Sequence, residues 1–384
     1  MNIGISCYPT LGGSGVLATE LGKALASRGH KVHIISDAIP FRLLGEFHEN
    51  IMFHEVDVAN YALFKNPPHE LSLATKLAEV IEYAELDILH SHYAIPHAVC
   101  AYLAKEMRPE SRVKIITTLH GTDITVLAQD RSLRDMIRFG IEKSDLVTAV
   151  SDSLVKQTEE LFRPRCPIRR VYNFVDPNTY RRIDVKQMRN CFAKPEQKIL
   201  LHASNFRAVK RVLDVVEVFD RVQQTVPSVL LLVGEGPELA KVRQIVKEKH
   251  LESNVKFLGK QDEVAKLYSL ADLFVLPSEK ESFGLVALEA MACGVPVIGS
   301  DAGGIPEVVE HGKCGYLYPV GDVQSMAEGA IQLLLDDHLH ASFAVYARKR
   351  VLDRFTLEDL VNEYERLYQL AIDGKPCYDY AKSV

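Results

Sequence analysis

The chain lacks the features of a secreted, membrane-spanning or nucleic-acid-binding protein. No apolar run approaches the ~20 residues that a helix needs to cross a bilayer. The start, MNIGISCYPT, has no charged segment followed by an apolar stretch, so we expect no signal peptide. The net charge of -6 leaves no basic excess for binding a phosphate backbone. These absences predict a cytoplasmic protein whose partners are neither nucleic acids nor membranes.

The cysteines also lack a pattern. There are seven, an odd number, and no two are spaced as CxxC. In a chain of this length, scattered cysteines indicate free thiols in a reducing compartment. This agrees with the cytoplasmic prediction.

Length and composition predict two globular domains of the α/β class. The 384 residues are more than one hydrophobic core comfortably holds. Hydrophobic residues make up 47% and charged residues 25%, which is ordinary for a globular enzyme. Short β-branched runs alternate with helical patterns, and this alternation is typical of βαβ units and parallel sheets.

The predicted strands fall into two series that meet near Tyr172–Pro177. The first series comprises Asn2–Ser6, Lys31–Ser36, Ile51–Val56, Ile88–His90, Lys114–Leu119 and Leu146–Ala149. The second comprises Ile199–Ala203, Val229–Val233, Val255–Leu258, Leu273–Leu276 and Pro296–Gly299. Prolines 164, 167 and 177 punctuate the join, so we expect a hinge there and interpret the arginines at 163, 165, 169 and 170 as linker.

The predicted domains are 1–172 and 173–356, and a further helix begins at Leu357. Because ligands of open parallel sheets bind beyond the carboxyl ends of the strands, two facing sheets would place the active site in a cleft between them.

A glycine-rich loop, Tyr8–Gly15, follows the first predicted strand and opens the first helix. Glycines there allow the backbone to approach an anion, and the helix N-terminus supplies N–H groups with a positive partial charge. Gly13-x-Gly15-x-x-Ala18 also fits the dinucleotide fingerprint, and Asp37 ends the second strand about where a ribose-binding acid would lie. A dehydrogenase is therefore an alternative, and a tight turn without a ligand is the simplest interpretation of the loop alone.

Two glutamates in the second half, Glu281 and Glu289, stand eight positions apart around a predicted helix start. Glu281 precedes the helix, beside N–H groups that favour negative charge. Glu289 lies one to two turns inside, and helical side chains tilt back toward the helix start. A carboxylate so placed can accept hydrogen bonds from both hydroxyls of a ribose. Taken singly, each glutamate is also explained as a solvated surface residue.

Cations for a diphosphate are offered by Ser204–Arg211, which follows the first strand of the second half and contains Arg207, Lys210 and Arg211. Gly234-Glu235-Gly236-Pro237 forms a second tight turn after the next strand. Carboxylates for hydroxyls, a helix start and cations for phosphates converge on one region. The ordered set therefore predicts a nucleotide-sugar site.

Together these motifs resemble the retaining GT-B glycosyltransferases with an E-x7-E motif, here Glu281 to Glu289. The likeness covers nearly the whole chain, from the glycine loop through the His120 segment to Gly303-Gly304. It implies two Rossmann-like domains that face each other across a cleft, with the C-terminal helix, 357–384, packing back on the N-terminal domain. A closer match within the family is carried by CYPTLGGSG, HSHYAIPHAV, TTLHGTDITVL, SNFRAVKR and GKQDEVAKLYSLADLFVLPSEKESFGL. This match implies UDP-N-acetylglucosamine as donor, L-malate as acceptor, no metal or other cofactor, and a place at the first step of bacillithiol biosynthesis.

The resemblance also implies the residues of the donor site. Lys210 and Arg207 would stabilise the leaving phosphate, Glu281 would bind sugar hydroxyls and Glu289 would bind the ribose. His120 would contact the sugar near its 6-hydroxyl or orient the reacting groups. Many members carry an arginine five residues before the lysine; this chain has Asn205 there, and Arg207 is expected to supply the charge. The implied catalytic residues are His120, Arg207, Lys210 and Glu281. The implied donor-binding residues are Gly13, Asn205, Arg207, Lys210, Gly234, Glu281, Ser282, Phe283, Gly284, Leu285 and Glu289.

The acceptor site is implied in the same way. Malate carries two carboxylates, so its pocket needs cations and N–H or O–H donors at charge-assisted distance. The implied acceptor-binding residues are Ser14, Lys65, Tyr93, Thr122 and Arg134. Each is also explained as an ordinary exposed polar residue.

Other functional classes leave part of the pattern unexplained. A dehydrogenase gives no role to Glu281, Glu289 or Lys210. A UDP-sugar epimerase would share the architecture and need no acceptor, and a non-catalytic nucleotide-sugar sensor would share the donor site. A glycolipid-making transferase would need a basic amphipathic face, and Pro164 and Pro167 break any helix in the one arginine cluster that might supply it. The sequence is also compatible with a homo-oligomer.

Overall fold

The structure is a computed structural model that describes residues 1–9, 13–45, 47–58, 68–261 and 263–374. Its contacts divide the chain into two units, one of Met1–Asn173 with Leu357–Val384 and the other of Phe174–Thr356. The domain boundary predicted from the sequence, 172/173, differs from the first of these divisions by one residue. The cleft expected between the two domains stays a prediction.

The described residues of the first unit form a seven-stranded parallel sheet in the order β3-β2-β1-β4-β5-β6-β7. Its strands are β1 Asn2–Ser6, β2 Lys31–Ser36, β3 Ile51–Glu55, β4 Ile88–His92, β5 Lys114–Leu119, β6 Leu146–Ala149 and β7 Ile168–Arg170. Its helices are α1 Gly13–Ser27, α2 His69–Tyr83, α3 Val99–Glu106, α4 Arg131–Glu142, α5 Asp152–Phe162 and α14 Leu357–Ile372. Short turns of helix lie at η1 Phe41–Leu43, η2 Ala94–Ala98, η3 Thr122–Val126 and η4 Leu127–Gln129.

The strand β7 was not predicted, and the interpretation of Arg169 and Arg170 as linker was wrong. Both belong to β7, which pairs in parallel with β6 at the edge of the sheet. Ile168 is its one buried residue. A three-residue edge strand with two arginines shows neither the alternation nor the apolar run by which buried strands are found.

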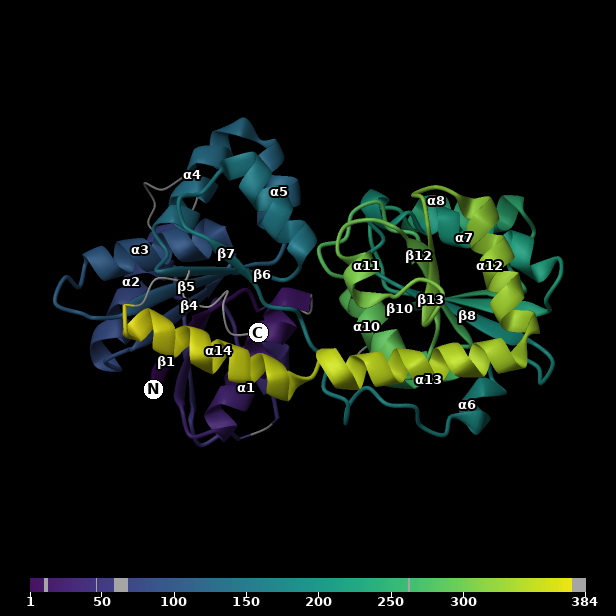
Figure 1. The fold of residues 1–384 in the computed structure, drawn as a ribbon, viewed down its shortest axis with the longest axis horizontal. Coiled ribbons are helices and arrows are strands. Elements are labelled where there is room, and N and C mark those ends of the chain that lie inside the picture. The colour runs from purple at the N-terminus through teal and green to yellow at the C-terminus, as the bar shows by residue number, and fades with distance from the viewer. Residues whose placement is uncertain (10–12, 46, 59–67, 262, 375–384) are drawn as a thin grey trace. The chain divides into compact units, whose positions relative to one another are not determined.

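Helix α14 brings the end of the chain back to the first unit, where it lies beside α1 (Figure 1). Tyr364 and Tyr368 on this helix are buried. The Tyr368 hydroxyl lies 2.8 Å from His90 Nδ1 in β4, and the Tyr364 hydroxyl lies 2.9 Å from Thr118 Oγ1 in β5. Helix α14 therefore packs on the sheet with its buried tyrosine hydroxyls hydrogen-bonded, as most buried polar groups in proteins are. Residues 375–384 of the predicted C-terminal segment lie outside the described residues.

The described residues of the second unit form a six-stranded parallel sheet in the order β10-β9-β8-β11-β12-β13. Its strands are β8 Lys198–Ala203, β9 Ser228–Val233, β10 Val255–Gly259, β11 Leu273–Leu276, β12 Val297–Ser300 and β13 Gly315–Tyr318. Its helices are α6 Lys186–Arg189, η5 Ala208–Lys210, α7 Val212–Gln223, α8 Leu239–Glu248, α9 Val264–Leu270, α10 Leu285–Ala292, α11 Ile305–Val308, α12 Val323–Leu335 and α13 Asp337–Arg354. The edge strand β13 was not predicted; it is half-buried, with Tyr316 and Tyr318 only partly covered.

All the strands predicted from the sequence are present, with ends shifted by two residues at most. Most of them were recognisable because they are buried on both faces and read as β-branched and leucine runs, whereas the edge strands β3 and β10 are only partly buried. Helix α7 shows the complementary pattern: Val212, Val215, Val216, Phe219 and Val222 recur at helical spacing and are buried in the core of the second unit.

Each sheet has a point where the strand order reverses, between β1 and β4 in the first unit and between β8 and β11 in the second. Both orders are those of the doubly wound nucleotide-binding fold. In such sheets ligands bind beyond the carboxyl ends of the strands at this point. The loops after β1, β4, β5, β8 and β11 are therefore where a site is expected.

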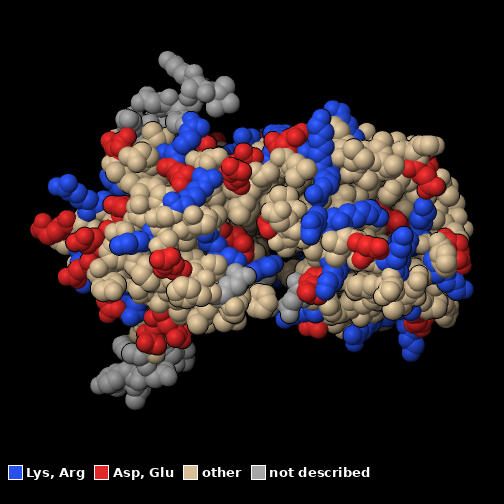
Figure 2. Space-filling model, turned by 90° about the horizontal axis from the view of Figure 1, so that it is seen from below, with Lys and Arg blue, Asp and Glu red and all other residues tan. Residues whose placement is uncertain are grey.

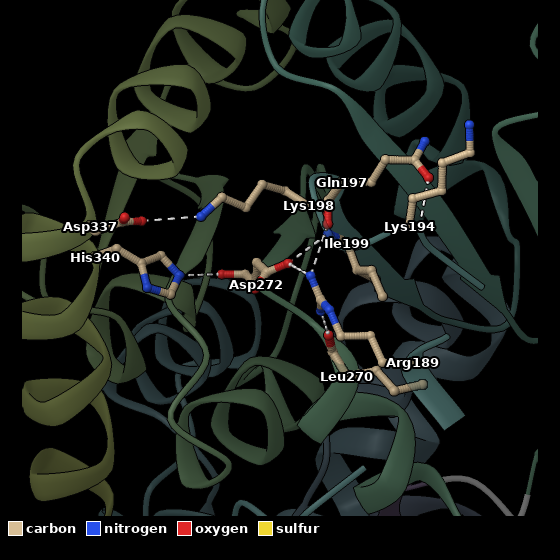
Figure 3. A network of polar contacts seen from close by, with 9 residues as sticks. All are labelled: Arg189, Lys194, Gln197, Lys198, Ile199, Leu270, Asp272, Asp337 and His340. Atoms are coloured by element: carbon tan, nitrogen blue, oxygen red, sulfur yellow. Dashed lines mark hydrogen bonds and ion pairs between the residues drawn. The ribbon is translucent and has the colours of Figure 1, made fainter. Parts of the chain in front are cut away.

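The opposite, amino edge of the second sheet is held by a polar network around Arg189 and Asp272 (Figure 3). The Arg189 guanidinium donates to Leu270 O at 2.6 Å, to Gln197 O at 2.9 Å and to Asp272 Oδ2 at 2.8 Å. Asp272 Oδ2 also accepts from Ile199 N at 2.7 Å, and its carbonyl lies 2.6 Å from His340 Nε2 on α13. One arginine of α6 thus ties the starts of β8 and β11 together, so this edge serves stability.

On the face seen in Figure 2, basic and acidic side chains are interspersed over the first unit, whereas basic side chains predominate over part of the second. Within the described ranges, no helix combines the length and the apolar character needed to cross a membrane.

Candidate active site

The loop between β11 and α10 places Glu281 where the sequence predicted it, just before a helix start. Helix α10 begins at Leu285, and Gly284 precedes it with a φ of 98°, a conformation that favours glycine. Glu281 Oε2 accepts from Lys210 Nζ at 2.5 Å. Both side chains are largely buried, with exposures of 15% and 19%. The two residues are 71 positions apart, so the fold itself makes this ion pair.

The doubled glycine Gly303-Gly304 packs against the same loop and holds it in place. Gly304 N donates to Glu281 O at 2.8 Å. A Cβ added at Gly303 would lie 2.1 Å from Glu281 O, and one added at Gly304 would lie 2.5 Å from Ser282 O. Any side chain here would push the loop away. The glycines therefore allow two backbones to touch, which holds Glu281 and the N–H groups of the α10 start in place.

Glu289 is the fifth residue of α10 and is half-buried. Its Oε2 accepts from the hydroxyl of Tyr268, on α9, at 2.8 Å. Burial, and after it the charge of Glu289, raises the pKa of Tyr268 well above its usual value, so the phenol stays a donor. This bond fixes the orientation of the Glu289 carboxylate. The sequence analysis did not identify Tyr268, because its position is one of several apolar positions in that helix.

The loop after β8 is shaped by the tight turn after β9. Gly234 has a φ of 112°, and a Cβ there would lie 1.8 Å from Ser204 O. A Cβ at Gly236 would lie 2.0 Å from Asn205 O. Both glycines are thus required for the close packing of the two loops. The donor-binding roles of Gly234 and Asn205 stay predictions.

His202, which the sequence analysis also missed, anchors this loop. It is buried in β8, its Nδ1 lies 2.8 Å from Val275 O, and its Nε2 lies 2.8 Å from Ser204 Oγ. Since a carbonyl only accepts, Nδ1 carries the proton and Nε2 accepts from the serine. Burial lowers the pKa of His202 to about 4, so it is neutral. The sequence signal that could have identified His202 is a histidine within an otherwise apolar strand.

The three expected cations are arranged differently from the prediction. Lys210 faces Glu281, and Arg207 is exposed at the N-terminal end of η5. Arg211 is directed elsewhere: its Nε donates to Asp214 at 2.6 Å, and its guanidinium lies against Gly321. The expected role of Arg211 as a phosphate-binding cation stays a prediction. Its backbone is left-handed, φ 50°, at the start of α7, where it pairs with the acid three residues on.

In the first unit, the fold joins three of the predicted residues at the carboxyl edge of the sheet. Ser14 Oγ, at the start of α1, lies 2.7 Å from the hydroxyl of Tyr93, which follows β4. The ring of Tyr93 lies 5.2 Å from that of His120, which follows β5. Tyr93 has a φ of 91°, which is costly for a residue with a side chain and is typical of functional sites. Gly13, next to Ser14, is exposed.

The segment after His120 is held by Asp123, which is fully buried. Its carboxylate accepts from Gly121 N at 3.0 Å and from Ala94 N at 3.1 Å. Burial raises the pKa of Asp123 to about 6, although these N–H groups act in the opposite direction. The carboxylate thereby ties the loop after β5 to the loop after β4, which keeps His120 and Tyr93 together. Asp123 was not among the predicted site residues.

The other predicted acceptor residues are not joined to this group by such contacts. Thr122 is exposed at the start of η3. Arg134 lies on α4, and its Nε donates to Ala128 O at 2.8 Å. Lys65 lies outside the described residues. Asp37, the ribose acid of the dehydrogenase alternative, pairs with His69 Nε2 at 2.6 Å.

The arrangement suits a phosphorylated sugar. Among the residues that the structure describes, no three His, Cys, Asp or Glu side chains are grouped to bind a metal ion. The carboxyl edge of the second sheet instead combines a helix start, a lysine and two carboxylates. Helix N-termini with cations bind phosphate, and carboxylates accept from hydroxyl groups.

Comparison with known proteins decides the family. Residues 11–179 match the model for "Glycosyltransferase Family 4", and residues 184–350 match that for "Glycosyl transferases group 1". The chain is 56% identical over 369 residues to the N-acetyl-alpha-D-glucosaminyl L-malate synthase of Bacillus anthracis, covering 96% of each chain. The chain belongs to the GT-B glycosyltransferases. It is therefore a glycosyltransferase enzyme, and the dehydrogenase alternative is removed.

More distant relatives agree with this family, and solved structures agree with the fold. The glycosyltransferase is 28% identical over 308 residues to the D-inositol 3-phosphate glycosyltransferase of Corynebacterium jeikeium, covering 75% of this chain and 73% of that one. Its fold matches that of Anabaena HepE in complex with UDP and glucose, with a TM-score of 0.81, 23% identity, and coverage of 96% and 99% of the two chains. It also matches the sucrose-phosphate synthase of Thermosynechococcus elongatus, with a TM-score of 0.79, 23% identity, and coverage of 98% and 100%.

Proposed function

We propose that this glycosyltransferase moves N-acetylglucosamine from UDP-N-acetylglucosamine to the hydroxyl of L-malate, with retention of configuration and without a metal. The observation that carries the proposal is the 56% identity to the synthase named for this product, which extends over 96% of both chains. The site of the second unit supports it because carboxylates, a lysine and a helix start lie at the edge where nucleotides bind.

On this proposal the donor lies along the carboxyl edge of the second sheet. The ribose hydroxyls donate to Glu289, whose carboxylate is oriented by Tyr268. The diphosphate lies at the start of α10, which begins at Leu285, since the first N–H groups of a helix have no partner within the helix. The sugar hydroxyls donate to Glu281. Asn205, Gly234 and Gly13 complete the contacts as backbone that approaches the donor.

Lys210 supplies the charge on which the chemistry depends. Its ammonium group has three N–H donors, and Glu281 at 2.5 Å takes one of them. The remaining donors serve the β-phosphate of the donor, and exposed Arg207 adds a second cation. Because the ion pair is largely buried, its interaction with a phosphate is stronger than it would be in water. Stabilising the charge that develops on a leaving group in such a site is a large contribution to catalysis.

The transfer then proceeds on one face of the sugar. The hydroxyl oxygen of malate bonds to the anomeric carbon as the bond from that carbon to the β-phosphate oxygen breaks. The hydroxyl proton passes to an oxygen of the departing phosphate, so the products are the glycoside and UDP. This route needs no carboxylate nucleophile of the kind used by retaining glycosidases.

The acceptor is assigned to the carboxyl edge of the first sheet. The hydroxyls of Ser14, Tyr93 and Thr122 and the ring of His120 offer donors for the malate carboxylates and the reacting hydroxyl. Arg134 and Lys65 are the cations proposed for the carboxylates, since charge-assisted bonds favour dianionic acceptors. The D-inositol 3-phosphate relatives make a phosphorylated acceptor the natural competitor.

The test is an assay of UDP release from UDP-N-acetylglucosamine with malate, with inositol phosphate and with no acceptor. We expect malate to give the fastest release, an α-configured product by NMR, and unchanged rates in EDTA. Faster turnover with inositol phosphate would overturn the malate assignment. A new sugar nucleotide formed without any acceptor would indicate an epimerase.

A further inference from the structure

Two histidines at the carboxyl edge of the first sheet, His92 and His120, are joined edge to edge. His92 Nδ1 lies 2.8 Å from His120 Nε2. The ring centroids are 5.1 Å apart and the ring planes are inclined by only 20°. Nearly coplanar rings at this separation meet through their in-plane nitrogens, so the N–H of one points at the lone pair of the other. One of the two rings is therefore the donor, and the structure indicates which.

His92 is held so that it cannot turn. It is 3% exposed, and the ring of His90 stacks on it with the centroids 4.4 Å apart. His90 is fixed in turn at both nitrogens, by Thr118 Oγ1 at 2.7 Å and by the Tyr368 hydroxyl at 2.8 Å. The orientation of His92 thus rests on β4, β5 and α14 together.

The other nitrogen of His92, Nε2, is buried and has no hydrogen-bond partner among the described residues. Burial lowers the pKa of both His92 and His120, in the case of His120 to about 3, so both rings are neutral near pH 7. A neutral imidazole has one N–H and one lone pair. If His120 were the donor, the only N–H of His92 would be buried without a partner. If His92 is the donor, only a lone pair is left there. Unpaired buried N–H groups are the rarer of the two in proteins.

We propose that His92 is a positioning residue that donates from Nδ1 to His120 Nε2 and fixes His120 in the tautomer with its proton on Nδ1. His120 then offers its substrates a hydrogen-bond donor and no basic nitrogen. The consequence for the reaction rests on the proposed function. His120 can stabilise an oxygen of the sugar or the acceptor, and it cannot take the proton of the acceptor hydroxyl. That proton must therefore leave with the departing phosphate.

The tautomer can be read directly in the intact enzyme. Protein labelled with ¹⁵N in histidine gives separate signals for protonated and bare ring nitrogens in long-range ¹H–¹⁵N spectra, and His120→Gln identifies the His120 signals. We expect His120 to be protonated on Nδ1 and bare on Nε2. Protonation on Nε2 would overturn the inference. A wild-type enzyme that shows the expected tautomer but does not use malate would refute the proposed function and leave this inference standing.

A matched pair of variants tests the consequence for catalysis. Asparagine at position 92 can place an amide N–H where Nδ1 lies, whereas the isosteric aspartate places only oxygen there. We expect His92→Asn to keep the Nδ1–H tautomer and most of kcat, and His92→Asp to reverse the tautomer and lower kcat by about 10²-fold, as the loss of a positioned donor does. Equal kcat values for the two variants, with unchanged His120 signals, would refute the role of His92. If neither variant folds in a thermal melt, the wild-type spectrum alone decides.

Discussion

The assignment of Glu289 to the ribose can be tested by replacing it with the isosteric glutamine. Glu289→Gln keeps an oxygen for the Tyr268 hydroxyl, which donates at 2.8 Å, but loses one acceptor oxygen and the charge. The Tyr268 hydroxyl takes one acceptor position of the Glu289 carboxylate. Hydrogen bonds to charged groups contribute about 1.5–3 kcal/mol each. Since about 1.4 kcal/mol is tenfold in affinity, we expect the dissociation constant of UDP to rise by about 10- to 100-fold.

The assay is calorimetric titration with UDP and with its 2′-deoxy analogue. Wild-type enzyme should lose affinity for the analogue, whereas Glu289→Gln should bind both nucleotides with similar, weak affinity, because the hydroxyl has no charged partner to lose. Tyr268→Phe is the control: it removes the orienting hydroxyl and leaves the carboxylate, so UDP binding should weaken by only a few-fold, about the effect of a neutral hydrogen bond. Wild-type affinity of Glu289→Gln for UDP, or an undiminished penalty for the analogue, would refute the assignment.

Four further outcomes follow from the contacts described above. Gly303→Ala should lower Tm and activity, because its Cβ would lie 2.1 Å from a backbone oxygen. The control is Gly312→Ala, which is also at positive φ but has nothing within 4 Å, so it should lower Tm only through backbone strain. Equal Tm shifts for the two variants would contradict this. Lys210→Gln should lower kcat by about 10²-fold and should also lower the denaturation midpoint, because the Glu281 carboxylate with which it pairs stays largely buried; a kcat within a few-fold of wild type would remove its role at the phosphate. Arg189→Met should lower the free energy of unfolding by about 2 kcal/mol, because its partner carboxylate stays largely buried, and should leave kcat/KM unchanged because it acts at the opposite edge of the sheet. Burial lowers the pKa of His90, His97 and His120 to about 3, so below pH 6.5 the unfolded chain binds protons that the folded chain does not. The free energy of unfolding should therefore fall by about 1.4 kcal/mol per pH unit for each of these histidines. Urea midpoints that stay level from pH 7 to pH 5 would contradict this.

Much of the fold was predictable because local pattern reports burial. Strands such as Lys114–Leu119 and Leu273–Leu276 are buried on both faces, so their sequences read as apolar runs between turn residues. The edge strands β7 and β13 were missed because they have only three and four residues, Ile168–Arg170 and Gly315–Tyr318, and neither reads as an apolar run. The start of α10 was also predictable, since the helix begins at Leu285, between Glu281 and Glu289 as expected.

Of the candidate site, the sequence by itself determined which chemical groups occur and next to which element: a carboxylate before a helix, another inside it, a lysine after a strand, a histidine at a strand end. Only the tertiary structure decided which of them meet. It pairs Lys210 with Glu281, turns Arg211 to Asp214, sets Tyr268 against Glu289 and joins His92 to His120. Except for Arg211, these partners are 21 to 71 residues apart. Periodicity describes what is near along the chain, whereas the order of strands in a sheet and the packing of loops at its edge determine what is near in space.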